Sequence, residues 1–413
     1  MQVIIIGGGA AGLMAMATIL ELNPTTQVTL IERNDGLGKK VIISGGGRCN
    51  VTTGLLDVKT VLTKYPRGNK FLSSAMHKFP PQAVVDWFEG HGVPLKTEPD
   101  LRVFPRSDNG HDVVKVFEEL FQAHHTTVLL KAPVIRVEKQ GEHFAIHLKT
   151  QPEPLVADKL ILTTGGQAYR QTGSTGDGYA FAQSLGHNIA ALAPSLNAFH
   201  TQETWPAEVA GLSFEWAELS ARTKTNQHFT GPFLFTHKGV SGPAVFALSS
   251  LVAFETYSPT TPLMVNIDLF PNQTVTELTL QLETTMSANP KKDFGNVLAS
   301  LVPKSLVTVL CRELKQPAHK HASEVSKKER TTAVAWLKGI PLNVVGRGAG
   351  DEFVTAGGVS LLEVNPSTME SRVCPGLYFA GEILDVDGFT GGFNLQASWA
   401  AGHLAGESIA AAS

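Results

Sequence analysis

The 413-residue sequence predicts an α/β protein in which a Rossmann-type nucleotide-binding domain is interrupted by a large insertion. Two observations predict this fold class. A buried-type strand, a glycine turn and a helix follow one another from the first residues. The 39 glycines also gather in clusters, near residues 7–12, 36–47, 165–178, 346–358 and 376–392. Because glycine lets a backbone approach a ligand closely, we expect these distant clusters to converge on one extended ligand.

The first thirty residues read as one βαβ unit. Residues 3–6 form a strand, 12–22 a helix that Asn23-Pro24 ends, and 28–31 a second strand closed by Glu32. In the turn, Gly7 permits the tight bend, Gly9 the approach of a pyrophosphate and Gly12 close helix–strand packing. Glu32 follows Gly12 by twenty residues, the spacing of a carboxylate that binds ribose hydroxyls. The pattern predicts dinucleotide binding at a helix N-terminus.

The sequence after Glu32 helps to distinguish an NAD-binding domain from a flavin-binding one. An NAD-dependent dehydrogenase continues with a second mononucleotide half, but here glycine-rich loops stand at 36–40 and 44–50. Helices are expected at 80–91 and 111–124, with two short strands between Pro94 and Pro105. A hairpin of residues 134–138 and 144–148 then feeds a strand at 159–164, an arrangement typical of flavoproteins. An NAD-dependent dehydrogenase remains the alternative.

The domain organisation follows from a change of pattern near Pro194. We expect a discontinuous nucleotide-binding domain from residues 1–190 and 351–413, and an insertion at 191–350. Within the insertion, about 195–270 and 336–350 read as β-rich and about 271–335 as helical. The chain ends in a small-residue helix, 395–412.

Composition and charge restrict the partners. The chain carries 34 Lys and Arg against 37 Asp and Glu, a net charge of −3, and 43% of its residues are hydrophobic. This balance excludes a disordered chain, and no apolar run approaches the roughly 18 residues of a membrane helix. The basic run Lys327–Arg330 reads as a solvated helix face. We therefore expect a small-molecule substrate, no nucleic-acid partner and no membrane; nothing sets the oligomeric state.

Cysteine usage and the first residues bear on the compartment. Cys49, Cys311 and Cys374 are widely spaced, so neither a disulfide framework nor a metal site is expected. The opening MQVIIIGGG lacks the basic segment and cleavage site of a signal peptide. We expect a cytoplasmic protein.

Four segments carry a resemblance to a known family. SGGGRCN at 44–50, LTTGG at 162–166 and GLYFAGEILDVDGFTGGFNLQASWAAGHLAG at 376–406, together with FLFTHKGVSGPA at 233–244, resemble the aminoacetone oxidase family of FAD-binding flavoproteins, the BaiN-like or YhiN-like group. The resemblance covers nearly the whole chain. It implies an FAD-dependent oxidoreductase related in fold to glutathione reductase and to succinate dehydrogenase flavin domains, with β-rich and helical insertions.

The resemblance also implies which residues hold FAD. The glycine turn would line the pyrophosphate, Glu32 would hold the adenosine ribose, and Gly381-Glu382 would bind ribityl hydroxyls. The start of the last helix would stabilise charge on the reduced flavin. The predicted cofactor-binding residues are Gly7, Gly9, Ala10, Ala11, Gly12, Glu32, Arg33, Lys40, Ser44, Gly45, Gly46, Arg48, Cys49, Asn50, Val134, Thr164, Gly165, Gly166, Gly381, Glu382, Gly391, Gly392, Phe393, Asn394 and Leu395.

Three side chains are candidates for chemistry beside the flavin. Cys49 would be a redox thiol if Arg48 lowers its pKa, or a small residue packed against the cofactor. His237 would act as acid or base, or lie in a hairpin turn. Asp385 would face the ribityl chain or substrate, or cap a turn; no metal ligand set accompanies it.

These observations predict an FAD-dependent oxidoreductase that acts on an unidentified small molecule by flavin hydride transfer. The sequence holds one GxGxxG, so NAD(P)H as reductant would bind transiently over the flavin or not at all. Besides the NAD-dependent dehydrogenase, a flavin-bearing binding or RNA-associated protein is the remaining alternative.

Overall fold

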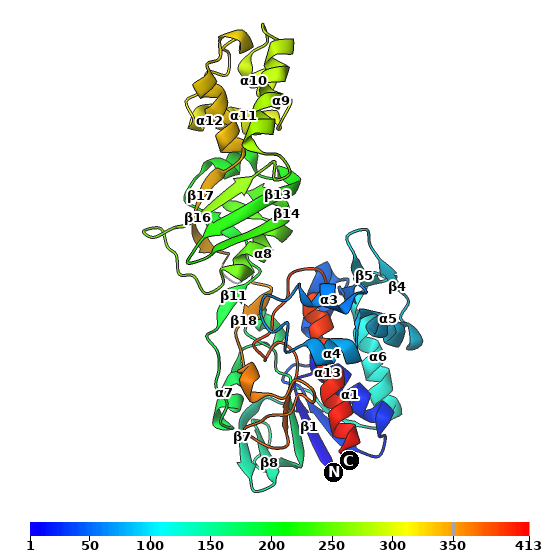
Figure 1. Ribbon diagram of the computed structural model, residues 1–413. Helices are drawn as coiled ribbons and strands as arrows, with labels where there is room; N and C mark the ends of the chain where they lie inside the picture. The colour runs from blue at the N-terminus through cyan, green and yellow to red at the C-terminus, as the bar shows by residue number, and fades with distance from the viewer. Residues whose placement is uncertain (349–351, 413) are drawn as a thin grey trace. The chain divides into compact units, whose positions relative to one another are not determined.

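The computed structural model describes residues 1–348 and 352–412 as two compact units (Figure 1). The first unit contains residues 1–195 and 352–412, and the second contains 196–348. The junction expected between residues 350 and 351 lies outside the described residues. Each unit has its own hydrophobic core.

The first unit is built on a five-stranded parallel sheet of order β19-β10-β1-β2-β6. Its strands are β1 (Gln2–Ile6), β2 (Gln27–Ile31), β6 (Thr127–Leu129), β10 (Lys159–Leu162) and β19 (Leu377–Phe379). The carboxyl ends of β1, β2 and β10 lie level, because Ile6 pairs with both Leu162 and Ile31. In such sheets ligands bind at this edge. The predicted βαβ start is confirmed, and β10 ends two residues earlier than expected.

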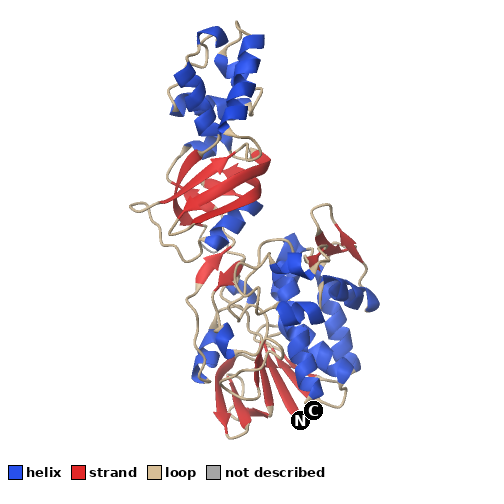
Figure 2. Ribbon diagram, in the orientation of Figure 1, coloured by secondary structure: helices blue, strands red, loops and turns tan. Residues whose placement is uncertain are grey.

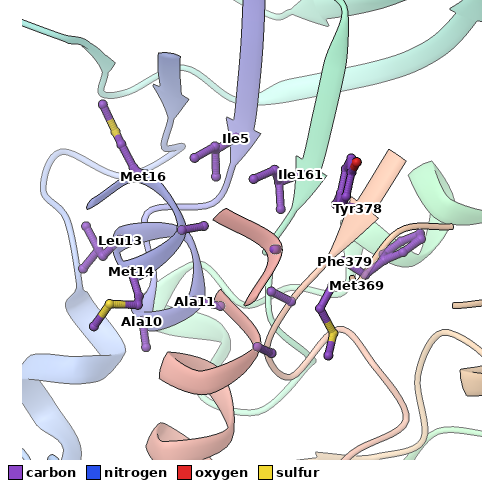
Figure 3. Close-up of a cluster of buried hydrophobic side chains, with 14 of the residues drawn as sticks. Ile5, Ala10, Ala11, Leu13, Met14, Met16, Ile161, Met369, Tyr378 and Phe379 are labelled. Carbon is purple, nitrogen blue, oxygen red and sulfur yellow. The ribbon is translucent and has the colours of Figure 1, made fainter. Parts of the chain in front are cut away.

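Two helices far apart in sequence cover this sheet. α1 (Ala10–Leu22) packs along α13 (Phe393–Ala411), as the blue and red ribbons of Figure 1 show. A Cβ at Gly402 would lie 2.3 Å from the Ala11 carbonyl oxygen, so only glycine permits this close approach. Figure 3 shows Ala11 and Leu13 of α1 beside Ile5 of β1 in the same core. The packing brings the two ends of the sequence to one site.

The other elements of the first unit flank this core (Figure 2). The hairpin of β7 (Val134–Gln140) and β8 (His143–Leu148) is confirmed, with β9 (Leu155–Ala157) as a third strand. The two short strands expected between Pro94 and Pro105 are confirmed, as are the helices expected at 80–91 and 111–124. The remaining elements are β3 (Thr52–Thr53), β4 (Leu95–Thr97), β5 (Arg102–Pro105), β11 (Ala193–Ser195), β18 (Val354–Ala356), α2 (Lys39–Ile43), α3 (Val58–Leu62), α4 (Ser73–Lys78), α5 (Pro81–Gly90), α6 (Gly110–Ala123) and α7 (Asp177–Ser184).

The second unit joins a closed barrel to a group of helices. The barrel order is β12-β15-β14-β13-β16-β17. Its strands are β12 (Phe199–Thr201), β13 (Ser213–Arg222), β14 (Asn226–Thr236), β15 (Gly239–Ser241), β16 (Leu263–Asp268) and β17 (Ile340–Arg347). The helices are α8 (Pro243–Leu251), α9 (Val275–Ala288), α10 (Phe294–Leu298), α11 (Lys304–Glu313) and α12 (Lys327–Leu337). The barrel strands fall within 199–347 and helices α9 to α12 within 275–337; α8 lies among the strands and was not predicted.

The described residues lack a membrane-spanning helix and a cluster of metal ligands. Within 1–348 and 352–412, no helix combines the length and apolar character needed to cross a bilayer. No group of three or more His, Cys, Asp or Glu side chains in the same ranges is arranged to hold a metal ion.

Candidate functional site

The glycine turn after β1 has the shape of an anion cradle. Gly7 has φ of 112°, and a Cβ there would lie 2.5 Å from the Thr163 carbonyl oxygen. A Cβ at Gly12 would lie 2.0 Å from the Gly7 oxygen, so the turn closes tightly against the helix. At Gly9, the N-cap of α1, a Cβ would meet no atom within 4 Å. The turn is therefore open at Gly9, where the free N–H groups of the first helical turn can receive a phosphate.

Glu32 lies beside this cradle at the carboxyl end of β2. Its carboxylate is buried and accepts hydrogen bonds from the N–H of Gly8 and the N–H of Asn34, both at 2.8 Å. The Glu32 carbonyl accepts from the N–H of Ala132, two residues before β7. The segment leading to Val134 thus runs next to Glu32. This arrangement suits an adenosine whose ribose meets Glu32 and whose base meets the Val134 backbone.

A second carboxylate, Glu382, is held across the site. It follows β19 and the left-handed Gly381, whose added Cβ would lie 2.8 Å from the Ala11 side chain of α1. Glu382 accepts from Lys40 Nζ at 2.6 Å and from the Thr355 N–H at 2.9 Å. Lys40, predicted to contact adenine or phosphate, is therefore engaged with the carboxylate predicted to bind ribityl hydroxyls.

A small pocket opens next to Glu382. It is bounded by the segment after β19 and by the first turns of α13. Its lining residues are Leu72, Gly381, Glu382, Leu384, Val386, Asn394, Ala397, Ser398 and Ala401. Three predicted cofactor residues, Gly381, Glu382 and Asn394, therefore share one pocket.

The SGGGRCN loop and the last helix meet. The side-chain amide of Asn50 is assigned the orientation in which both its oxygen and its nitrogen form hydrogen bonds. The oxygen accepts from the Gly392 N–H at 2.8 Å, and the nitrogen donates to the Thr52 carbonyl at 3.0 Å. Gly392 is the N-cap of α13 and has a φ of 88°. A Cβ there would lie 2.2 Å from the Thr52 oxygen, so this position requires glycine. At Gly46 a Cβ would meet no atom within 4 Å, so this loop is also open.

Two arginines predicted at the cofactor point elsewhere. Arg48 pairs with Glu98 at 2.7 Å and stacks over Phe104. Arg33 pairs with Asp177 at 2.9 Å. Asp177 is the first residue of α7, and Gly176 is the N-cap. In this structure both guanidinium groups are committed to protein carboxylates.

The redox role considered for Cys49 is not supported. The side chain is fully buried in the core of the first unit, and burial raises its pKa to about 12. The guanidinium that was expected to lower that pKa belongs to Arg48, which is engaged with Glu98. A thiol with this pKa stays protonated at neutral pH, which favours the packing interpretation of Cys49 over the redox one.

The two aspartates after Glu382 have different environments. Asp387 is fully buried, pairs with Arg67 through two hydrogen bonds and accepts from Ser195 Oγ at 2.9 Å. Asp385 is half-buried; burial raises its pKa, the Arg67 charge opposes that shift, and its Oδ1 has no hydrogen-bond partner among the described residues. Asp387 and Arg67 form an ion pair that sequence patterns did not indicate.

Two further buried polar atoms lie near Glu382 and Asp385. The Tyr179 hydroxyl and Thr164 Oγ1 have no hydrogen-bond partner in the described ranges. Burial raises the pKa of Tyr179, and the charges of Glu382 and Asp385 add to the rise. These groups, with the open cradle at Gly9, fit a ligand rich in hydroxyl and phosphate oxygens such as FAD. The residues present therefore suit the cofactor predicted from sequence.

His237 belongs to the second unit. Together with Lys238 it forms the exposed two-residue turn between β14 and β15, where Thr236 pairs with Gly239. A Cβ at Gly239 would lie 2.3 Å from the Phe199 oxygen of β12. This close approach explains why position 239 of the FLFTHKGVSGPA segment is a glycine.

The fold and this site define a class, the flavin-dependent oxidoreductases with a Rossmann-like FAD-binding domain. The chain belongs to the HI0933-like protein Rossmann domain family, which matches residues 1–408.

Relatives and solved structures agree with this class. The chain is 30% identical over 409 residues to the 3-dehydro-bile acid delta(4,6)-reductase of Clostridium scindens, covering 98% of each chain. It is 29% identical over 410 residues to the ribosomal RNA dihydrouridine synthase of Escherichia coli, covering 99% of this chain and 98% of that one. The fold resembles the 3-ketosteroid-delta4-(5alpha)-dehydrogenase of Rhodococcus jostii RHA1, with a TM-score of 0.53, 14% identity and coverage of 99% and 96%.

Proposed function

We propose that the protein is an FAD-dependent reductase that saturates a carbon–carbon double bond conjugated to a carbonyl group. The two relatives suggest this chemistry, because a delta(4,6)-reductase of a 3-oxo steroid and a dihydrouridine synthase both reduce such a bond. The observation that carries the proposal is the convergence of Gly9, Glu32 and the Glu382–Lys40 pair at the carboxyl edge of one parallel sheet. FAD, when bound, supplies the hydride.

The chain's own residues would bind and orient this cofactor. The turn from Gly7 to Gly12 would hold the pyrophosphate, and Glu32 the ribose of the adenosine half. Glu382, positioned by Lys40, would bind ribityl hydroxyls. The N-terminus of the 19-residue α13 would favour negative charge on the flavin ring. Asp385 stays a proposal as a ribityl or substrate contact, supported by its unpartnered Oδ1.

Several further assignments stay proposals. The nucleotide-binding domain would comprise 1–190 and 351–413, and the insertion 191–350 would shape the substrate site. His237 would give or take the proton that accompanies hydride transfer. NAD(P)H would reduce the flavin through transient binding. The three cysteines without disulfides support a cytoplasmic location.

The test uses the FAD-loaded protein. We expect purified protein to be yellow, or to turn yellow and gain thermal stability with FAD. NADH or NADPH should bleach the flavin anaerobically, and a 4-en-3-one steroid or a uridine-containing RNA should restore its colour. Fumarate and aminoacetone serve as comparison substrates. Protein that stays colourless at saturating FAD contradicts the proposal. The proposal also fails if oxygen reoxidises the reduced flavin but neither the steroid nor the RNA does. If the His237→Ala variant reacts at the wild-type rate, His237 is not the proton donor.

A further inference from the structure

Positive charge is concentrated in the helical part of the second unit. Residues 271–338 contain ten Lys and Arg against six Asp and Glu, in a chain whose net charge is −3. The rest of the chain is therefore acidic. Such a separation of charge places an attractive field for polyanions over one region of the surface.

Two loops of this region lie side by side. One, residues 289–293, joins α9 to α10, and the other, 314–326, joins α11 to α12. Three backbone hydrogen bonds connect them: Phe294 N–H to the Lys320 oxygen, Ala322 N–H to the Lys292 oxygen, and Ser323 N–H to the Pro290 oxygen, at 2.9 to 3.0 Å. α9 leads away from the barrel and α12 leads back to it, so both loops lie at the tip of the helical part (Figure 1).

Besides Lys315, which follows α11 closely, four lysines at this tip are exposed. Lys291 and Lys292 lie on the first loop, and Lys327 and Lys328 begin α12. None of the four has an ion-pair partner within residues 1–348 and 352–412. Lys327 follows Ser323 by four residues, so its Cα lies within about 14 Å of the joined loops. We name Lys291, Lys292, Lys327 and Lys328 the tip lysines.

The carboxylates nearby do not neutralise the tip lysines. Asp293 is flanked by the exposed His319 and His321, at 3.4 and 3.7 Å. Glu329 accepts from Lys320 at 3.0 Å and caps α12 through the Ser326 N–H. Glu324 is the remaining exposed carboxylate of these loops. Positive charge is therefore in excess at the tip.

We propose that the tip lysines dock the phosphate backbone of an RNA. Phosphate contacts by lysine provide sequence-independent affinity, and two relatives that match this chain over nearly its full length are ribosomal RNA dihydrouridine synthases. An anionic membrane is the less suitable partner, because membrane-surface helices also present large apolar side chains. In the two tip loops, 289–293 and 314–326, and in α12, no described residue is an exposed large hydrophobic residue; Val275 and Leu280, both on α9, are exposed.

Under this proposal the Lys327–Arg330 run, expected from sequence to be a solvated helix face, is also part of a binding surface. In sequence, that run lies more than thirty residues from Lys291 and Lys292, and the net acidic chain hides the local excess. The folding of two loops onto each other joins the two pairs. The inference does not rest on the proposed reaction, since binding is measured without turnover.

The test compares two quadruple variants of the FAD-loaded protein by fluorescence anisotropy with a short labelled RNA hairpin. One changes the tip lysines: Lys291→Gln, Lys292→Gln, Lys327→Gln and Lys328→Gln. The other makes the same charge change at exposed lysines elsewhere: Lys59→Gln, Lys70→Gln, Lys149→Gln and Lys224→Gln. Between about 50 and 200 mM salt, the tip variant should bind about tenfold more weakly or worse, and its salt slope should fall by about 3. The control variant should stay within about twofold of wild type.

Three outcomes overturn the proposal. An equal loss of RNA affinity in the tip variant and the control variant would show that binding depends on net charge alone. Wild-type affinity weaker than about 100 µM at physiological salt would leave no specific surface to explain. Retention on phosphatidylglycerol vesicles without RNA binding would make the tip a membrane contact. Circular dichroism and flavin absorbance confirm that each variant is folded, and reduction of a steroid enone by the tip variant tests the proposed reaction separately.

Discussion

The two units of the chain shape their surfaces by different means. Of the 21 glycines with positive φ among the described residues, only Gly211, Gly239 and Gly242 belong to the second unit. The first unit uses the rest, many of them around the sheet edge where Gly9 and Gly46 leave open space. The second unit relies on regular strands and helices and carries charged side chains at its tip. Backbone shape thus builds the ligand site, and side-chain charge builds the second surface.

The largest expected effect concerns buried charge. The Asp387→Asn substitution leaves Arg67 beside a neutral amide in the first unit, where the aspartate is fully buried. Loss of one partner of a buried ion pair costs about 3–5 kcal/mol of unfolding free energy. Urea unfolding of the FAD-free protein measures this change.

The matched control for Asp387 lies in the second unit. Glu208 pairs with Arg312 at 2.7 Å, and both side chains are about half exposed. The Glu208→Gln variant should unfold at nearly the wild-type urea concentration, because exposed pairs contribute little. If the two variants lose equal stability, the contrast between buried and exposed pairs does not hold in this protein.

The next effect concerns cofactor affinity. For the Gly9→Val variant, a Cβ at this position would meet no protein atom within 4 Å and the backbone conformation is ordinary, so the fold should survive. Its side chain would occupy the space above the helix N-terminus, and FAD affinity should fall about a hundredfold, or about 2.7 kcal/mol. Fluorescence titration with FAD measures the change. The control is Gly346→Val on β17, where an added Cβ would also meet no atom within 4 Å. If wild type, Gly9→Val and Gly346→Val bind FAD with equal affinity, Gly9 does not belong to the cofactor site.

The parts predicted from sequence share a local signal. The Gly7–Gly12 turn, Glu32 and the β7–β8 hairpin all lie in short segments whose spacing or alternation determines their structure. The parts that were missed depend on partners far apart in the chain. Lys40 and Glu382 are 342 residues apart, and Arg67 and Asp387 are 320 apart. No local pattern pairs such residues, because only the tertiary fold brings them together.

A smaller effect concerns Cys49 of the first unit. The Cys49→Ala variant should reduce its flavin at the wild-type rate, since a buried thiol with a pKa of about 12 is not a redox group at neutral pH. Because folding raises this pKa, the neutral thiol favours the folded state, and that contribution is lost as pH rises from about 9 towards 12. Wild type should therefore lose more stability than Cys49→Ala over this range. A reduction rate that falls more than tenfold would restore the redox interpretation.

The smallest effect concerns Glu329 in the helical part of the second unit. Hydrogen bonds from Ser326, with the Lys320 ammonium, lower the pKa of Glu329 to about 2. Its folded-state pKa lies below the ordinary 4.5, so its contribution is present above that pH and is lost as pH falls towards 2. Glu329→Gln should lower stability by less than about 1 kcal/mol at neutral pH, and the difference from wild type should vanish in acid. Thermal unfolding followed by far-UV circular dichroism, at neutral pH and in acid, measures the difference. If the stability difference between wild type and Glu329→Gln persists in acid, where Glu329 is protonated, it arises from helix capping by the neutral side chain. The negative charge of Glu329 would then not be its cause.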